Sequence, residues 1–259
     1  MRSLAGPDLG GAEIYETRYP AGRTQPRHAH DYTKVSFVLA GSVVERVHGA
    51  TRPVRALEAI VKPAGTEHSD AFGARGAWLL TLRLPPSHDA DHDALDQYRL
   101  ASASDFGRAA VTTIAALRGL APSAAAATGL RRLLAALRAP EPAATTASPP
   151  LWLAPTVDAI HATYQQPILV GDLARRAGVH PVHFARVFRR HVGCTVRDYR
   201  RRLRLQAAAT AMALGDQPLA EVAVASGFAD QPHMSRLFKQ WAGLSPRRYR
   251  ALADPPAGR

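Results

Sequence analysis

The sequence predicts an α+β protein of two domains, with strands in its N-terminal part and helices in its C-terminal part. A length of 259 residues with 46% hydrophobic side chains is typical of about two globular domains. Within residues 12–85, short apolar runs such as Val35–Leu39 and Trp78–Leu82 are bounded by glycine and proline, which favours strands and turns. From about Asp91 onward, apolar residues recur at helical spacing instead.

A linker separates the two predicted domains. Residues 139–150 contain proline, alanine and hydroxyl residues with almost no bulky apolar side chain, a composition typical of linkers. We therefore expect a β domain over 1–90, a helical segment over 91–138, and an all-α domain over 151–259.

The helical segment carries a stripe of leucines that has two interpretations. These leucines can pack onto the β domain or form the face of a homodimer. We favour the dimer, because residues 91–138 present more amphipathic faces than one small β domain can cover. The stripe consists of Leu130, Leu133, Leu134 and Leu137.

Positive charge is concentrated in the C-terminal domain. The chain carries a formal net charge of +12, and residues 151–259 hold 16 Lys and Arg against 7 Asp and Glu, a net of +9. Such a concentration is typical of a module that binds phosphate groups. A solvated basic surface is the alternative, and composition does not decide between them.

Cysteine content and hydropathy indicate the cellular compartment in which the protein is expected to lie. A single cysteine, Cys194, excludes an internal disulfide framework and fits a reducing environment. The first 15 residues lack the apolar region of a signal peptide, and no stretch approaches 18 consecutive apolar residues. We expect a cytoplasmic protein with no membrane partner.

The C-terminal domain contains a diverged internal repeat, offset by 49 residues at its first glycine and by 50 from its arginine onward. Duplication of one supersecondary unit explains why the same residue types recur in two copies. The first copy reads Ala174-x-x-Ala177-Gly178-Val179, Arg186-x-Phe188, Gly193 and Tyr199-Arg200. The second copy reads Ala223-x-x-Ser226-Gly227-Phe228, Arg236-x-Phe238, Gly243 and Tyr249-Arg250.

Each copy predicts a helix, a glycine turn and a second helix. Gly178 and Gly227 can adopt a positive φ and end the first helix in a tight turn. The second helix of copy one begins at His180-Pro181, since proline is tolerated in a first helical turn. Its inward residues are Phe184, Val187 and Phe188, matched in copy two by Met234, Leu237 and Phe238.

Over residues 155–252 these landmarks resemble the DNA-binding domain of the AraC/XylS family of transcription regulators. The second copy is especially similar, from Gly227 to Lys239 and then Gly243-Leu244-Ser245-Pro246. The resemblance implies seven helices, with a central helix over Val196–Leu214 that Gly215 stops. It also implies a transcription factor that binds double-stranded DNA specifically and acts with RNA polymerase, as an activator or a repressor.

The resemblance places the residues that read bases on the two recognition helices. In the first helix the outward residues are Val182, His183, Ala185, Arg186, Arg189 and Arg190, and in the second they are Gln231, Pro232, Ser235, Arg236 and Lys239. Since arginine pairs with guanine and glutamine with adenine, we expect Arg186, Arg236 and Gln231 to determine specificity.

The other outward residues have different expected roles. Val182, Ala185 and Pro232 are limited to apolar contact with thymine methyl groups or to reading DNA shape. Arg189, Arg190 and Lys239 are expected to contact phosphates. Residues 197–204 hold five arginines, and we expect most of them to form a solvated helix face rather than a DNA contact.

Residues 12–85 resemble the cupin family. Gly22-x5-His28-x-His30 with Gly41 resembles the first cupin motif, and Pro63–His68 resembles the second. The resemblance implies a jelly-roll β-barrel. In metal-binding cupins, three histidines and one glutamate hold an ion, and here Lys34 stands in place of the glutamate. We therefore expect no cofactor, with Zn²⁺ or Fe²⁺ at His28, His30 and His68 as the alternative.

The same resemblance implies that the barrel binds a small-molecule effector, whose chemical class the sequence does not define. Lys34 can pair with an anionic effector or extend into solvent. The expected lining residues are His28, His30, Lys34, Phe37 and His68.

Three other functions compete with this interpretation. A cupin enzyme with a DNA-binding appendage conflicts with Lys34. A DNA alkyl-transfer protein needs an activated thiol, but Cys194 matches a turn position, Leu244, in the second copy. A non-specific architectural protein conflicts with two recognition helices that carry different outward residues. We expect no enzyme and no catalytic residue.

Overall fold

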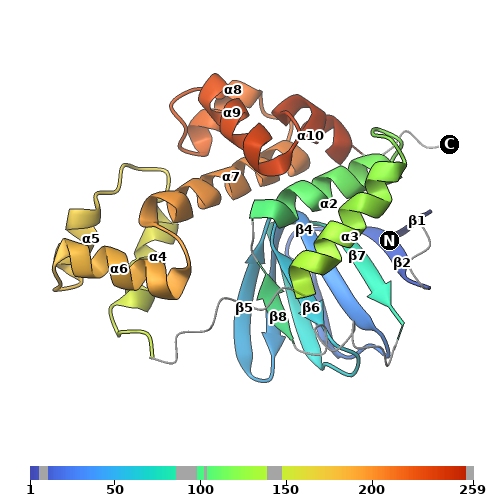
Figure 1. Ribbon diagram of the computed structural model, residues 1–259, viewed down its shortest axis with the longest axis horizontal. Coiled ribbons are helices and arrows are strands. Elements are labelled where there is room, and N and C mark those ends of the chain that lie inside the picture. The colour runs from blue at the N-terminus through green and yellow to red at the C-terminus, as the bar shows by residue number, and fades with distance from the viewer. Residues whose placement is uncertain (6–10, 86–97, 102–103, 139–147, 255–259) are drawn as a thin grey trace.

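The computed structural model describes residues 1–5, 11–85, 98–101, 104–138 and 148–254, and shows an N-terminal antiparallel sheet and C-terminal helices (Figure 1). The strands are β1 (Arg2–Leu4), β2 (Glu13–Tyr19), β3 (Thr24–His28), β4 (Thr33–Val47), β5 (Ala50–Arg55), β6 (Ala59–Lys62), β7 (His68–Leu84) and β8 (Arg99–Ala101). The helices are α2 (Ser104–Leu117), α3 (Ala124–Arg138), α4 (Leu153–Thr163), α5 (Val170–Arg176), α6 (Pro181–Val192), α7 (Val196–Leu214), α8 (Leu219–Ala225), α9 (Gln231–Ala242) and α10 (Pro246–Ala253).

The sheet is built around the two long strands β4 and β7. Its order is β1-β2-β7-β4-β6-β8, with β3 added to β7 and β5 added to β4. Because β8 pairs with β6, the sheet takes in residues beyond the boundary expected at residue 90. Gly41, at a bulge of β4, has φ +78°, and a Cβ atom there would collide with the carbonyl of Gly76 on β7. The strands predicted for the N-terminal part are confirmed and form an antiparallel sheet, while closure of this sheet into a jelly-roll barrel stays a prediction.

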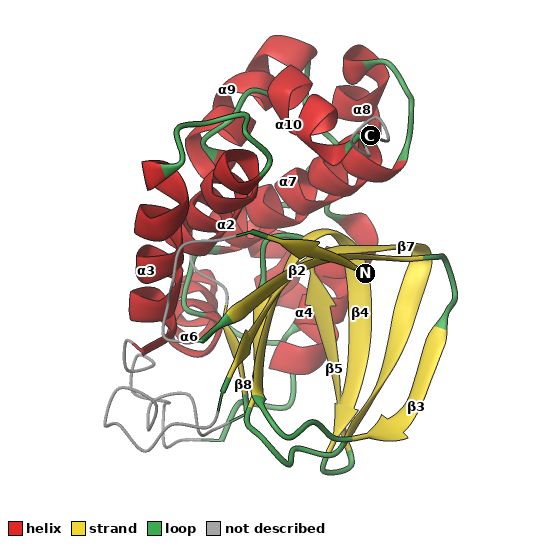
Figure 2. Ribbon diagram, turned by 90° about the vertical axis from the view of Figure 1, so that its right-hand side faces the viewer, coloured by secondary structure: helices red, strands yellow, loops and turns green. Residues whose placement is uncertain are grey.

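The sheet has one face covered by helices and one face that carries polar groups. Val35, Phe37 and Leu80 belong to a hydrophobic cluster shared with α2, α3 and α7. Alternate residues such as Val38 and Leu79 form a separate cluster on the opposite face. The helices lie against the first face in Figure 2.

Two leucines of the predicted stripe on α3 pack inside the molecule. Leu130 and Leu133 are 0% exposed and lie in the same cluster as Ile114 of α2, with Leu134 at its edge. The predicted dimer face is therefore wrong for Leu130 and Leu133, because α2 packs against α3 and they are buried. The side chain of Leu137 lies outside the described residues.

The C-terminal helices follow the expected order. Helices α4 to α10 are the seven that the resemblance implies, and α7 has the expected bounds. The Thr195 hydroxyl caps α7 by accepting a hydrogen bond from the Asp198 amide at 3.1 Å. Of the expected linker, residues 139–147 lie outside the described residues.

Two hydrophobic cores support this region. One belongs to α4, α5, α6 and the start of α7, and includes Phe184, Phe188 and Tyr199. The helices α8, α9 and α10 bury Met234, Phe238 and Tyr249 in the cluster that also contains the sheet, α2 and α3. The second half of the C-terminal region therefore shares its core with the N-terminal domain, which we define as the sheet with α2 and α3.

None of the helices in the described part of the chain combines the length and the apolar surface that crossing a lipid bilayer requires.

Candidate nucleic-acid interface

The first helix-turn-helix unit consists of α5 and α6. Phe184 and Phe188 on α6 are 0% exposed and anchor the helix in its core. Gly178 has φ +68° in the turn before it, as the repeat predicts. The outward face is exposed at every residue expected there, namely Val182, His183, Ala185, Arg186, Arg189 and Arg190.

The second helix-turn-helix unit consists of α8 and α9, and it repeats this arrangement. Met234 and Phe238 are 0% exposed, and Gly227 has φ +86° in the turn. The Asp230 carboxylate caps α9 by accepting a hydrogen bond from the His233 amide at 2.7 Å. Of the expected outward residues, Pro232, Arg236 and Lys239 are exposed, while Gln231 and Ser235 are half-buried.

Helix α7 holds the two recognition helices apart. It has 19 residues, so it spans about 28 Å at the usual helical rise. Figure 2 shows α6 and α9 on the same side of the molecule. Two recognition helices held on one side can enter successive major-groove segments, which are about 34 Å apart.

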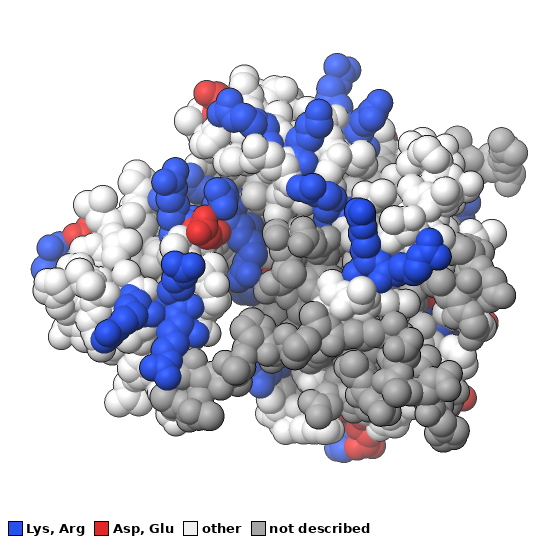
Figure 3. Space-filling model, in the orientation of Figure 1, with Lys and Arg blue, Asp and Glu red and all other residues white. Residues whose placement is uncertain are grey.

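That side of the molecule is strongly basic. Lys and Arg side chains gather over α6, α7 and α9 in Figure 3, and few acidic side chains interrupt them. The phosphate backbone of DNA attracts such a surface in a salt-dependent manner. Geometry and charge therefore both favour a nucleic-acid interface here.

Part of the arginine cluster on α7 has a structural role. The Nε atoms of Arg200 and Arg204 donate hydrogen bonds to the carbonyl of Tyr164, at 2.9 and 2.8 Å. Arg204 also donates to the carbonyl of Gln165 at 2.7 Å. Arg201 pairs with Asp198 at 2.8 Å. Arg200 and Arg204 thus satisfy carbonyl groups just after α4, where the carbonyls of a helix end lack partners within the helix.

Cys194 lies in the turn between α6 and α7, half-buried against the first core. Burial raises the pKa of its thiol, which opposes formation of a thiolate. This environment is typical of a structural cysteine rather than a nucleophile.

On the other face of the sheet, the structure brings His28, His30 and His68 together. One nitrogen of each ring lies within 4.8 Å of the others. The Nδ1 atoms of His28 and His68 lie 2.8 and 2.9 Å from the carbonyls of Pro26 and Thr66, so both Nε2 atoms can accept or ligate. The Nε2 atom of His68 lies 3.9 Å from Oδ2 of Asp70. Burial is the largest cause lowering the pKa of His30 to about 3 and of His68 to about 4. Neutral rings oriented by carbonyls present an Nε2 lone pair, which is the form that a metal ion can use.

Lys34 lies on the same face, between Lys62 on β6 and Arg83 on β7. Lys62 is paired with Glu45 and, at 3.5 Å, with Asp70, whereas Lys34 has no ion pair among the described residues. Burial and then Lys62 lower the pKa of Lys34 to about 8. Within the described chain, a cation without an ion pair thus lies close enough to His30 to help lower the pKa of that ring.

Two parts of this site differ from the expectation. Phe37 faces the helices, on the opposite side of the sheet from Lys34, so the structure does not bring it to the histidines. The paired group of Glu45, Lys62, Asp70 and Tyr98, with a Tyr98–Glu45 hydrogen bond of 2.9 Å, was not expected. Strand alternation could have placed Lys62 and Asp70 with His68, but their pairing depends on strand register.

Comparisons with known proteins agree with the C-terminal geometry. A family model described as a helix-turn-helix domain matches residues 173–252. The chain is 30% identical over 89 residues to the probable transcription factor PqrA of Proteus vulgaris, covering 34% of this chain and 73% of that protein. It is 36% identical over 81 residues to the regulator Rv1931c of Mycobacterium tuberculosis, covering 31% of each chain.

Among solved structures, an AraC-type regulator from Chromobacterium violaceum is 25% identical with a TM-score of 0.38, covering 41% of this chain and 95% of that one. The chain thus spans most of the length of PqrA but less than a third of Rv1931c.

Proposed function

Because the chain belongs to the AraC/XylS family of transcriptional regulators, we propose that it reads one specific DNA sequence with both recognition helices, α6 and α9. The observation that carries this proposal is the placement of two exposed, basic recognition faces on one side of the molecule. RNA polymerase is the partner on which the bound regulator acts.

The proposed division of roles follows the chemistry of the side chains. Arg186 and Arg236 have exposed guanidinium groups that can each bind a guanine edge with two hydrogen bonds. Gln231, at the start of α9, pairs with adenine. Arg189, Arg190 and Lys239 lie farther along their helices and neutralise phosphates.

We propose that the N-terminal domain binds a small effector, and that this effector is an organic acid. Lys34 supplies a half-buried ammonium group without an ion pair among the described residues. The Nε2 atoms of His30 and His68 are buried and have no hydrogen-bond partner within the described chain. Buried polar groups without partners are costly, so a carboxylate that accepts from Lys34 and from an Nε2–H of His30 would stabilise the site.

Mapping the DNA bound by the tagged full chain across its own genome tests the regulatory function. We expect a limited set of sites that share one sequence and lie upstream of genes. Binding spread evenly over the genome would contradict specific regulation.

Thermal unfolding with a panel of small carboxylates and their neutral amides tests the effector class. At least one carboxylate should raise the unfolding temperature of the wild type but not of Lys34→Met, and its amide should have no effect. If the purified protein holds equimolar metal that His28→Ala and His68→Ala both abolish, the histidines form a metal site instead.

A further inference from the structure

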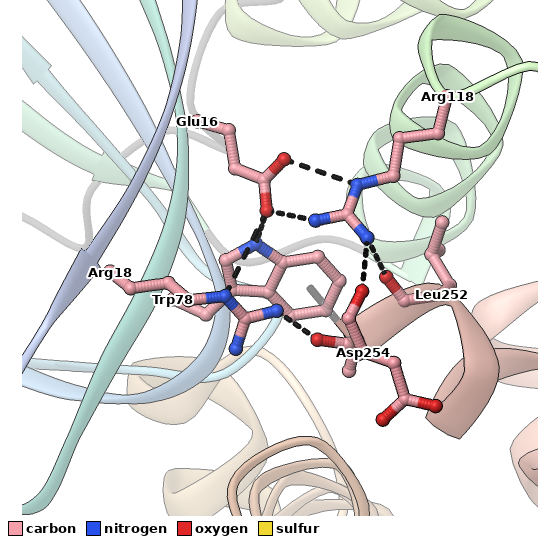
Figure 4. A network of polar contacts seen from close by, with 7 residues as sticks. Glu16, Arg18, Trp78, Arg118, Leu252 and Asp254 are labelled. Carbon is pink, nitrogen blue, oxygen red and sulfur yellow. Dashed lines mark hydrogen bonds and ion pairs between the residues drawn. The ribbon is translucent and has the colours of Figure 1, made fainter. Parts of the chain in front are cut away.

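Two arginines of the N-terminal domain bind the end of the last helix, α10. Arg118, directly after α2, donates from Nη1 to the carbonyls of Leu252 and Asp254, the latter at 2.8 Å. Arg18, on β2, donates to the carbonyl of Ala253 between them (Figure 4). The last carbonyls of a helix lack intrahelical partners and carry partial negative charge, so two guanidinium groups fit this helix end.

A buried carboxylate holds the two arginines in place. Glu16 on β2 is 5% exposed and accepts from Arg118 through both Nε, at 3.1 Å, and Nη2. It also accepts from Trp78 Nε1 at 2.8 Å, and lies 3.9 Å from Arg18 Nε. Both guanidinium groups lie over the Trp78 ring, at 4.8 and 5.6 Å from its centroid. We name Glu16, Arg18 and Arg118 with the three carbonyls the arginine clamp.

The clamp connects the N-terminal domain to the second recognition helix. Tyr249 of α10 lies edge-on to Phe238 of α9, with ring centroids 5.0 Å apart, and Arg108 of α2 donates to the carbonyl of Gln240 on α9. The first recognition helix is anchored differently, because Phe184 and Phe188 of α6 lie in the separate core of α4, α5 and α6.

We propose that Glu16 and Arg118 are positioning residues for α9, and that the N-terminal domain therefore sets the DNA contacts of the second unit without setting those of the first. This inference rests on the proposed function and names its regulation. A shift of β2 or β7, the strands that carry Glu16 and Trp78, moves the carbonyls at the end of α10. Readout by α9 then changes, while α6 keeps its own support.

The test uses the full chain and a double-stranded DNA site selected by the wild type from a random pool. Two derivatives of that site are prepared, one altered in the segment read by α6 and one in the segment read by α9. Affinities for all three DNAs are measured for the wild type, Arg118→Met and Arg131→Met. Arg131 is exposed on α3 and is not part of the clamp, so its variant controls for the lost charge.

In the wild type and in Arg131→Met, each altered segment should weaken binding at least tenfold. In Arg118→Met, altering the α9 segment should weaken binding less than threefold, while the α6 segment keeps its full effect. A lower fraction of folded protein would reduce the apparent affinities for all three DNAs by the same factor. The affinity for each altered site relative to the selected site would then stay unchanged. If Arg118→Met does not fold, Arg118→Lys, which keeps the charge but cannot reach Glu16 and two carbonyls at once, is measured in the same way.

The inference would be overturned if Arg118→Met discriminated against both altered sites as strongly as the wild type does. It would also be overturned if Arg118→Met lost discrimination equally at both sites. Either result would leave the proposed function intact. A wild-type chain that selects no sequence from the pool would overturn the proposed function, and this inference with it.

Discussion

The Tyr249 hydroxyl on α10 donates a hydrogen bond to the backbone carbonyl of Leu39 on β4, 210 positions earlier in the sequence. Tyr199, the matching residue of the first repeat copy, instead has its hydroxyl 2.7 Å from His161 Nε2 on α4. The same landmark of the repeat thus ties the second copy to the N-terminal domain and the first copy to its own core.

Replacing Tyr249 with phenylalanine should destabilise the protein. The side chain is 0% exposed, so the change leaves a buried carbonyl without this partner, and such losses are typically about 1–3 kcal/mol. Urea unfolding of Tyr249→Phe measures the effect. Tyr199→Phe is the matched variant and should have the smaller effect, because His161 is only half-buried. Equal or reversed effects would show that the contact with Leu39 contributes little.

The turn glycines of the two copies should respond unequally to alanine. Both have a positive φ, which disfavours alanine by about 1–2 kcal/mol. At Gly178 an added Cβ would meet nothing within 4 Å, whereas at Gly227 it would lie 2.7 Å from the Cα of Gln165. Gly227→Ala should therefore lower the unfolding temperature more than Gly178→Ala. Equal shifts would mean that the segment after α4 yields without strain.

Arg236→Ala should weaken binding to the selected DNA by about 1–3 kcal/mol and relax base preference at one position. The cause is the loss of a two-bond contact with a guanine edge. Affinity and base preference are measured together, with Arg75→Ala as a control, since Arg75 is exposed on the sheet. If Arg236→Ala kept the wild-type affinity and preference, Arg236 would not read bases.

Acid should destabilise the first unit through His161. Burial lowers the pKa of His161 to about 4 in the folded protein, from the ordinary 6.5 of an unfolded chain. Between these values the unfolded chain binds more protons, so the free energy of unfolding falls as the pH drops from about 6.5 to 4. His161→Gln should lose less unfolding temperature than the wild type between pH 7 and pH 5. An identical loss in both proteins would exclude this contribution.

The sequence predicted the parts of the structure that local patterns determine. Gly178, Gly227, Phe188 and Phe238 occupy their expected places, because turn chemistry and helical periodicity depend on near neighbours. His28, His30 and His68 also lie together as expected. His28 and His30 belong to the segment that resembles the first cupin motif, and His68 belongs to the segment that resembles the second.

Other features depend on contacts between distant elements. Leu130 and Leu133 form an apolar stripe whether α2 or a second chain covers it, so the stripe alone could not exclude a dimer. Phe37 was assigned to the wrong face relative to Lys34, although an odd separation along a strand would have indicated opposite faces. The Glu16–Arg118 pair joins residues 102 positions apart, and no local pattern marks it.

In vitro selection of double-stranded DNA by the full chain, repeated with Arg186→Ala and with Arg236→Ala, tests the central claim most directly. We predict that the wild type enriches one site with two constant segments about 10 base pairs apart, as two helices in successive major grooves require. Sites enriched by each variant should keep the wild-type bases in one segment and vary in the other, and the varying segment should differ between the two variants. An absence of enrichment, or an enriched site that both variants bind as the wild type does, would contradict DNA reading by two recognition helices.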